Sequence, residues 1–153
     1  IQQELDLVQD YFTIQKYRYG GTITLEIQID DEGLLPCQIL KFTMQPLIEN
    51  AIFHGIEPKG CAGSICIHIY KDSSGDIHIE IQDDGVGIQP EVAAGLLVQD
   101  TSAGSSFFKE IGISNVHKRL QYEFGSPYGL SIDSTPGQGT VVTILLPFTQ
   151  RKE

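Results

Sequence analysis

The sequence has no long run of hydrophobic residues and carries little positive charge. Its longest apolar stretches, 93–98 and 141–146, are interrupted by Gly95 and Thr143 and fall well short of the 18 or so residues that a membrane-spanning helix needs. Ten lysines and arginines stand against twenty aspartates and glutamates, which gives a net charge of −10. Because nucleic-acid binding depends on cations that contact phosphates, this balance argues against DNA or RNA as a partner.

Cysteine is also scarce, and several common site motifs are absent. Cys37, Cys61 and Cys66 are odd in number and include no CxxC pair, which favours free thiols in a reducing compartment. Cys61, Cys66 and His68 allow a zinc hypothesis, but a fourth ligand is not obvious, so we favour buried or half-buried thiols. The chain has no GxxxxGK[ST], no GxGxxG after a strand and no GxSxG, so P-loop, Rossmann and α/β-hydrolase sites lack support.

Alternation of apolar and polar residues predicts a sheet that is buried on one face. The predicted strands are 22–30, 65–70, 77–83, 130–134 and 140–147. Helical spacing predicts helices at 1–19, at about 43–53 and from about Ile113 onward, with a weaker helix at about 90–98. We therefore predict an α/β two-layer sandwich, in which helices cover one face of a mixed, mostly antiparallel sheet.

The most informative residue is Asp83, which ends the strand 77–83. Counting by twos from Ile77 places its carboxylate on the core side of the sheet, where a charge is costly unless donors surround it. Gly85 and Gly87 follow, and they allow backbone or a ligand to approach closely. One interpretation is an Asx-type turn that closes the strand. The other is a carboxylate that accepts a hydrogen bond from a ligand, such as the exocyclic amine of a purine.

The second predicted helix carries polar side chains beside its apolar stripe. Thr43 is the expected N-cap, and Pro46 then lies in the first turn, where a missing N–H costs nothing. Asn50 and His54 are four residues apart and share a helix face. Asn50 is either a structural amide or an oxygen ligand for Mg²⁺, and His54 is either structural or functional. Glu49 points about 100° away from Asn50.

Two further segments could contact a ligand. Gly112 lies at the predicted start of the third helix, behind a segment rich in glycine and serine, and free N–H groups at such a start favour phosphate. Asn115, Lys118 and Arg119 fall in the first turns of this helix, so the alternative is a solvated basic face. Residues 137–140, taken alone, indicate only a tight turn.

These segments occur in the order found in one family. Residues 45–55 (QPLIENAIFHG) resemble the N box of bacterial sensor histidine kinases of the LytS/YesM type, and residues 83–87 (DDGVG) resemble their G1 box. Residues 111–120 (IGISNVHKRL) are similar to the G2 box and its following helix, and residues 137–140 (GQGT) to the closing GxGT. The resemblance covers nearly the whole chain.

The resemblance implies the Bergerat ATP-binding fold, which is shared with gyrase, Hsp90 and MutL. In this fold Asp83 would accept the adenine amine, and Asn50 would hold Mg²⁺ that bridges the phosphates. The other residues expected to line the nucleotide are His54, Gly85, Gly87, Ile88, Gly112, Ile113, Asn115, Lys118, Arg119, Gly139 and Thr140. Residues 88–111 would form the ATP lid. No catalytic side chain is assigned with certainty, and Glu49 and His54 are the candidates.

The sequence departs from the family pattern at three positions. Pro46 lies four residues before Asn50, where a glutamate polarises the attacking water in ATPases of the superfamily. A base for hydrolysis is therefore missing, which favours phosphoryl transfer to a protein side chain. Glu110 stands where a glycine often opens the G2 box, and Phe53 stands where a lysine often binds phosphate. The cations that would have to compensate are Lys109, Lys118 and Arg119.

The resemblance also implies a role for the chain, which begins at Ile1 and which we expect to be an excised fragment. Residues 1–20 would link to a dimerisation domain that carries the phosphoacceptor histidine. Residues 21–153 would be the catalytic domain, a protein histidine kinase that transfers the ATP γ-phosphoryl group to that histidine. The chain's own histidines do not resemble the acceptor; they are His54, His68, His78 and His117.

The full protein would be a homodimer at the cytoplasmic side of the bacterial cell membrane, with a response regulator as its partner in a two-component system. The fragment itself would contact neither membrane nor nucleic acid. Two alternatives stay open. One is a Ser/Thr kinase of the anti-sigma type on the same fold, and the other is a nucleotide-binding or interaction module that has lost catalysis.

Overall fold

Five strands form a single mixed sheet. The computed structural model describes residues 1–98 and 107–149, and for 107–111 it describes the backbone only. The strands are β1 (Ile23–Ile29), β2 (Gly63–Lys71), β3 (Ile77–Asp83), β4 (Gly129–Thr135) and β5 (Gly139–Leu146). They are ordered β1-β2-β3-β5-β4; β1 and β2 are parallel, and the other neighbours are antiparallel. The predicted mixed, mostly antiparallel sheet is confirmed.

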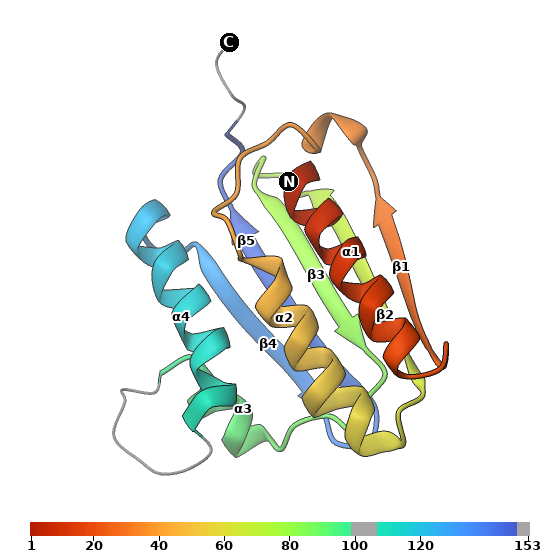
Figure 1. Cartoon of the computed structure of the whole chain (residues 1–153). Coiled ribbons are helices and arrows are strands. Elements are labelled where there is room, and N and C mark those ends of the chain that lie inside the picture. Colours follow the sequence, from red (N-terminus) through yellow and green to blue (C-terminus); the bar gives the residue numbers. More distant parts are fainter. Residues whose placement is uncertain (99–106, 150–153) are drawn as a thin grey trace.

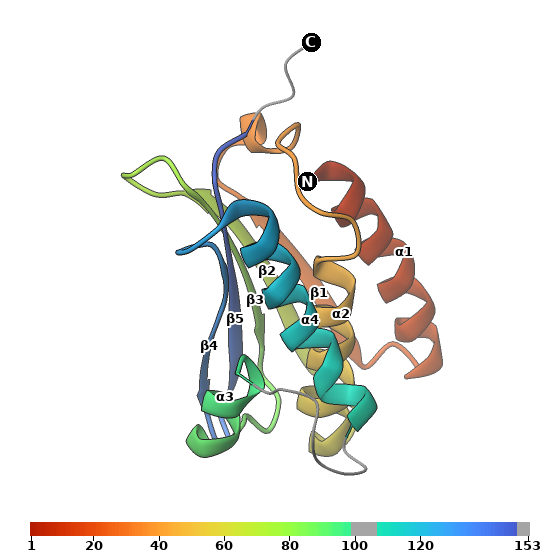
Figure 2. The ribbon, with the colours of Figure 1, turned by 90° about the vertical axis from the view of Figure 1, so that its left-hand side faces the viewer.

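Helices cover one face of this sheet, as Figures 1 and 2 show. They are α1 (Gln2–Arg18), α2 (Met44–Asn50) and α4 (Phe107–Phe124), whereas the short helix α3 (Pro90–Leu96) lies beside β4 at one end of the sheet. Helix α2 continues as the π-turn η2 (Ala51–Ile56) and the 3₁₀ turn η3 (Glu57–Lys59), and another 3₁₀ turn, η1 (Glu32–Leu34), follows β1. The predicted two-layer sandwich is confirmed. Among the described residues, no helix combines the length and hydrophobicity needed to cross a membrane.

The alternation of side chains decides which face of the sheet is buried. In β3, Ile77, Ile79 and Ile81 are almost completely buried under the helices, whereas the residues between them are half-buried or exposed. Strand β5 follows the same pattern, with Ile144 and Leu146 inside. Because strand residues alternate between the two faces, the core lies only between sheet and helices, and the opposite face of the sheet is open.

Helix α1 belongs to the same hydrophobic core as the sheet. Leu5, Val8 and Phe12 are buried in it, and their spacing of three or four residues places them on one stripe of the helix. The helix ends at Arg18, and glycines 20 and 21 follow at positive φ, as predicted. The domain boundary predicted after residue 20 falls in this turn and stays a prediction.

Two predicted helix boundaries are wrong. The second helix does not end at Phe53 but continues through the π-turn to Ile56, and the backbone of Gly55 in this turn packs against Asp83. The third helix begins at Phe107 and not near Ile113. A glycine inside a helix costs only about 1 kcal/mol relative to alanine, so Gly112 does not have to mark a helix end.

Candidate functional site

Asp83 is a buried acid at the end of β3. It is 5% exposed and lies on the core side of the sheet, as the alternation predicted. Its Oδ1 accepts the N–H of Gly85 at 2.9 Å, and the backbone N–H of Thr140 is a second donor. The Asx-type turn is therefore present, and it closes around a carboxylate that faces away from bulk water.

The electrostatic setting of Asp83 makes it a strong acceptor. Burial raises the pKa of its carboxyl to about 6, and the charge of Asp84 adds to this shift. The N–H groups of Gly85 and Thr140 and the Lys59 cation oppose it. At neutral pH the carboxylate is thus mostly ionised in a poorly solvated place, where an additional N–H donor from a ligand would be bound favourably.

Gly55 and Gly85 pack backbone against backbone beside this carboxylate. A Cβ on Gly55 would lie 2.6 Å from the Asp83 Oδ1, and a Cβ on Gly85 would lie 2.3 Å from the carbonyl carbon of Gly55. The N–H of Val86 donates to the Gly55 carbonyl at 3.0 Å. The structure therefore joins η2 directly to the loop after β3, and only glycine fits at these two positions.

The loop between β4 and β5 closes the other side of the site. A Cβ on Gly139 would lie 2.0 Å from the Asp83 carbonyl oxygen, and Gly139 has a φ of 114°. Gly87, at a φ of 73°, packs as closely against Thr135. The N–H of Gly137 donates to the Val86 carbonyl at 2.7 Å. The segments predicted to contact the adenine thus meet at one end of the sheet.

Ser134 connects three of these segments. It was not among the site residues predicted from the sequence. Its Oγ accepts the N–H of Ile88 at 2.8 Å and lies 2.8 Å from the Thr140 Oγ1. It also donates to the Gly139 carbonyl at 3.0 Å. Thr140 itself is buried. The only sequence signal for Ser134 is its place opposite Thr140 in the β4–β5 hairpin.

Asp84 fixes the same loop from the side of β2. Its two carboxylate oxygens accept the N–H and the hydroxyl of Ser64, each at 2.9 Å. Lys59 donates to the Asp84 carbonyl at 2.8 Å and lies 3.5 Å from its Oδ1. Partial burial raises the pKa of Asp84, but the bonds from Ser64 and the Lys59 charge bring it below its usual range. Lys59 and Ser64 were not predicted from the sequence either.

Asn50 lies at the junction between α2 and η2. It and His54 are half-buried, and Asn50 precedes by five residues the Gly55 backbone that contacts Asp83. The amide and the carboxylate therefore belong to the same end of the molecule. Glu49 is directed elsewhere, as predicted, because its Oε1 accepts from Gln45 Nε2 at 3.1 Å.

Asn50 is the one metal ligand predicted from the sequence, so Mg²⁺ would need water and phosphate oxygens as its other ligands. Among the described residues, no group of three His, Cys, Asp or Glu side chains could hold a metal ion. The amide oxygen of Asn50 is a ligand type that Mg²⁺ accepts, and Mg²⁺ commonly completes its coordination with water and phosphate oxygens. The zinc hypothesis for the cysteines gains no support, and the three thiols are free, Cys37 buried and the other two half-buried.

Not all residues of α4 that were predicted to contact phosphate are placed to do so. Gly112 lies in the second turn and faces Pro46, so its N–H is not among the unpaired donors of the first turn; the prediction that it opens the helix is wrong. The side chain of Ile113 is buried in the core. Asn115 and Lys118 are exposed.

Arg119 lies away from Asn50. Its guanidinium donates to the carbonyl of Lys41 at 2.7 Å, and Lys41 precedes α2 whereas Asn50 ends it. The predicted contact of Arg119 with phosphate is therefore not supported. Of the predicted lid 88–111, the structure describes helix α3 and the flanking backbone. The side chains of Lys109 and Glu110 lie outside the described residues.

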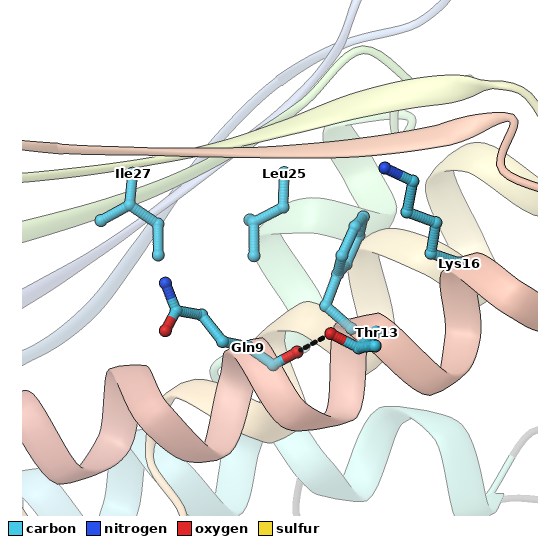
Figure 3. Close-up of a pocket in the computed structure, with 6 residues that line it drawn as sticks. Gln9, Thr13, Lys16, Leu25 and Ile27 are labelled. Carbon is cyan, nitrogen blue, oxygen red and sulfur yellow. Dashed lines mark hydrogen bonds between the residues drawn. The ribbon is translucent and has the colours of Figure 1, made fainter.

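A separate groove runs between α1 and β1 (Figure 3). Its lining residues are Gln9, Phe12, Thr13, Lys16, Leu25 and Ile27. Thr13 donates within the helix to the carbonyl of Gln9 at 2.8 Å. The groove brings together no acid and base, and it is formed by elements that do not contribute to the site around Asp83. It is therefore no competing candidate for catalysis.

Comparison with known proteins assigns the chain to a family. A family model described as histidine kinase-, DNA gyrase B-, and HSP90-like ATPase matches residues 38–150. The chain belongs to this family. The ATP-binding fold that the resemblance implied is thereby confirmed, and the site around Asp83 is the candidate nucleotide site of an ATPase-like domain.

Curated relatives of this ATPase-like domain are sensor kinases. The chain is 36% identical over 147 residues to the sensor histidine kinase YesM of Bacillus subtilis, which is 96% of this chain and 23% of that protein. It is 34% identical over 148 residues to the sensor histidine kinase YpdA of Escherichia coli, 96% of this chain and 24% of that protein. The chain thus spans about a quarter of the length of these relatives.

Solved structures show the same fold. The nucleotide-free catalytic domain of histidine kinase ThkA matches with a TM-score of 0.70 and 17% identity, over 97% of this chain and 94% of that chain. Histidine kinase ThkA in complex with the response regulator protein TrrA matches with a TM-score of 0.68 and 18% identity, over 100% of this chain and 42% of that chain.

Replacing Gly85 should disrupt this ATPase-like domain, whereas replacing Gly112 should not. In Gly85→Ala the new Cβ would collide with the Gly55 backbone, so we expect a loss of about 2–4 kcal/mol in the free energy of unfolding. In Gly112→Ala the nearest atom to the new Cβ is 3.7 Å away, and the helix should gain about 0.5–1 kcal/mol. Urea unfolding of both variants measures these changes. Equal stability of the two would contradict the packing described here.

Burial of the Asp83 charge should make stability depend on pH. Because the folded pKa of about 6 lies above the unfolded value near 4, the cost of the buried charge grows as pH rises through this window. From about pH 4.5 to pH 7.5, the stability of Asp83→Asn relative to wild type should therefore rise by about 2 kcal/mol. Urea unfolding at several pH values tests this, with the exposed Asp10→Asn as control. A constant difference would refute the burial of this charge.

Proposed function

We propose that this chain is the ATP-binding catalytic domain of a two-component sensor histidine kinase. The observation that carries the proposal is the buried Asp83 carboxylate inside a backbone cradle that has no room for side chains. The family assignment and the kinases that match 96% of the chain support it.

Recognition of the adenine base is assigned to Asp83. Its ionised carboxylate would accept a hydrogen bond from the exocyclic amine, and the desolvated surroundings strengthen such a bond. The glycine residues 85, 87 and 139 keep Cβ atoms out of the surrounding turns. The hydroxyls of Ser134 and Thr140 bond to each other, and the Ser134 hydroxyl also donates to the Gly139 carbonyl. These bonds hold both side chains in place.

Binding of the phosphates is assigned to the end of α2. The amide oxygen of Asn50 would be a ligand of Mg²⁺, which supplies charge neutralisation on the phosphates when it is bound with ATP. His54 would lie along the nucleotide near the ribose or the phosphates. Asn115 and Lys118, which are exposed on α4, are proposed to face the phosphates.

The residues near Asn50 favour transfer over hydrolysis. Pro46 occupies the position one turn before Asn50 and has no group that could orient a water molecule. Glu49 accepts a hydrogen bond from Gln45. Burial and the charge of Glu49 raise the pKa of Tyr11 to about 12, which places Glu49 beside α1. The γ-phosphorus–oxygen bond would therefore break as a bond to a histidine nitrogen of another domain forms, with ADP as leaving group.

The acceptor histidine and the other partners would lie outside this chain. We propose a dimerisation domain that carries the acceptor, a homodimeric full-length protein and a response regulator that receives the phosphoryl group. A solved complex of histidine kinase ThkA with the response regulator protein TrrA, whose kinase has the same fold, supports the last of these. We place the domain at the cytoplasmic side of a bacterial membrane, as expected of a sensor kinase.

Calorimetric titration with a non-hydrolysable ATP analogue tests the proposal. Wild type should bind more tightly with Mg²⁺ than with EDTA, and Asn50→Ala should lose at least about tenfold of the Mg²⁺-dependent affinity. Gln28→Ala removes an exposed amide from β1 and should bind as wild type does. If wild type and Asn50→Ala bound equally and without metal dependence, the kinase mechanism would fail. A nucleotide-binding module that has lost catalysis would then be the better description.

A further inference from the structure

The helix that carries Asn50 is capped by a side chain from another helix. The Glu4 Oε1 accepts the N–H of Phe42 at 2.8 Å, and its Oε2 accepts the N–H of Thr43 at 2.9 Å and of Met44 at 3.1 Å. Thr43 occupies the N-cap position, as predicted, but its Oγ1 donates to the Leu40 carbonyl at 2.7 Å and makes no capping bond. One carboxylate of α1 thus binds three consecutive N–H groups at the start of α2.

This cap is buried and therefore costly to break. Glu4 is 4% exposed, Thr43 1% and Met44 0%. A buried carboxylate is stable only where donors and positive potential surround it, and a helix N-terminus supplies both. Phe42 adopts a φ of 59°, which is uncommon for a residue other than glycine, in the turn where the three N–H groups converge.

The same turn is held from a second helix. Arg119 of α4 donates to the carbonyl of Lys41 at 2.7 Å, next to the N–H groups that Glu4 binds. The start of α2 is therefore attached to α1 by a charge-assisted contact and to α4 by another. Both contacts lie at the opposite end of α2 from Asn50.

A displacement at the start of α2 would reach the candidate site. Helix α2 runs from Met44 to Asn50 and passes directly into η2, whose Gly55 packs against Asp83. A helix has a fixed rise of about 1.5 Å per residue, so a shift of its first turn along the axis is carried to its last. Asp83 is held in the sheet by the pairing of β3 with β2 and β5, so a shift of α2 would move Asn50, which lies on α2 itself, more than Asp83.

We propose that Glu4 is a positioning residue. Through its cap on α2 it fixes the axial position of Asn50. The position of α1 relative to α2 therefore determines the Mg²⁺-dependent part of nucleotide binding. This inference rests on the proposed function, because it uses the assignment of Asn50 to the metal. Adenine recognition by Asp83 should depend much less on Glu4, because strand pairing on both sides of β3 holds Asp83. The two contributions can therefore be separated by measuring affinity with and without metal.

Glu4→Gln tests this role, since it keeps the shape of the side chain but removes its charge and one acceptor oxygen. The affinity for a non-hydrolysable ATP analogue in Mg²⁺ should fall by about tenfold, and the affinity in EDTA should fall much less. Asp10→Asn removes an exposed carboxylate from the same helix and should change neither affinity. Ile77→Val weakens the core at the far end of β3 and controls for lost stability. All titrations are made where circular dichroism shows folded protein.

Two further results decide the role of Glu4. In an Asn50→Ala background, Glu4→Gln should cause no additional loss, because its effect passes through Asn50. In NMR spectra without ligand, Glu4→Gln should shift the Asn50 side-chain amide resonances, whereas Asp10→Asn should not. Additive losses, equal losses in Mg²⁺ and EDTA, or unmoved Asn50 resonances would each overturn the proposal.

The proposed function fails in a different way. If wild type itself gained no affinity from Mg²⁺, the metal role of Asn50 would be refuted, and the Asn50 resonances would still report whether Glu4 positions this residue. Should Glu4→Gln not fold, Glu4→Asp keeps the charge on a shorter side chain. It should give a smaller loss that is again larger in Mg²⁺ than in EDTA, and equal losses in the two titrations would contradict the proposal.

Discussion

The candidate site is built around a buried charge, the carboxylate of Asp83 at the end of β3. It is tolerated because two backbone N–H groups reach it and because Gly55 and Gly85 let η2 and the following loop close against it without side chains. The β4–β5 turn completes the enclosure through Gly139. An acid in such a place is destabilising for the fold, and a bound partner for it would explain why the surrounding backbone is built so tightly.

The molecule separates the two tasks proposed for it by structural element. Base recognition lies on the sheet, whose strands fix Asp83, and metal binding lies on α2, which is anchored at its far end by Glu4. The anchor belongs to α1, the helix that leads into the domain. On the proposed assignment, a movement of α1 would therefore displace Asn50 more than Asp83.

The sequence predicted those features that depend on local pattern. Alternation along β3 placed Asp83 on the buried face, and glycine spacing marked the turns around it, because strand period and positive φ are local properties. Contacts between distant segments were not predictable: Glu4 reaches Thr43 across 39 residues, and Ser134 reaches Ile88 across 46. The prediction that Gly112 opens the third helix was wrong because a glycine that opens a helix and one inside it look alike in sequence.

The most direct test of this account is the choice between two bases. An adenine nucleotide offers an exocyclic amine to Asp83, whereas a hypoxanthine nucleotide presents a carbonyl oxygen at the same position and would face the carboxylate with no donor. We predict that wild type binds ADP at least about tenfold more tightly than inosine diphosphate, and that Asp83→Asn loses most of this preference. Equal affinity of wild type for the two nucleotides would contradict the assignment of Asp83 to the base.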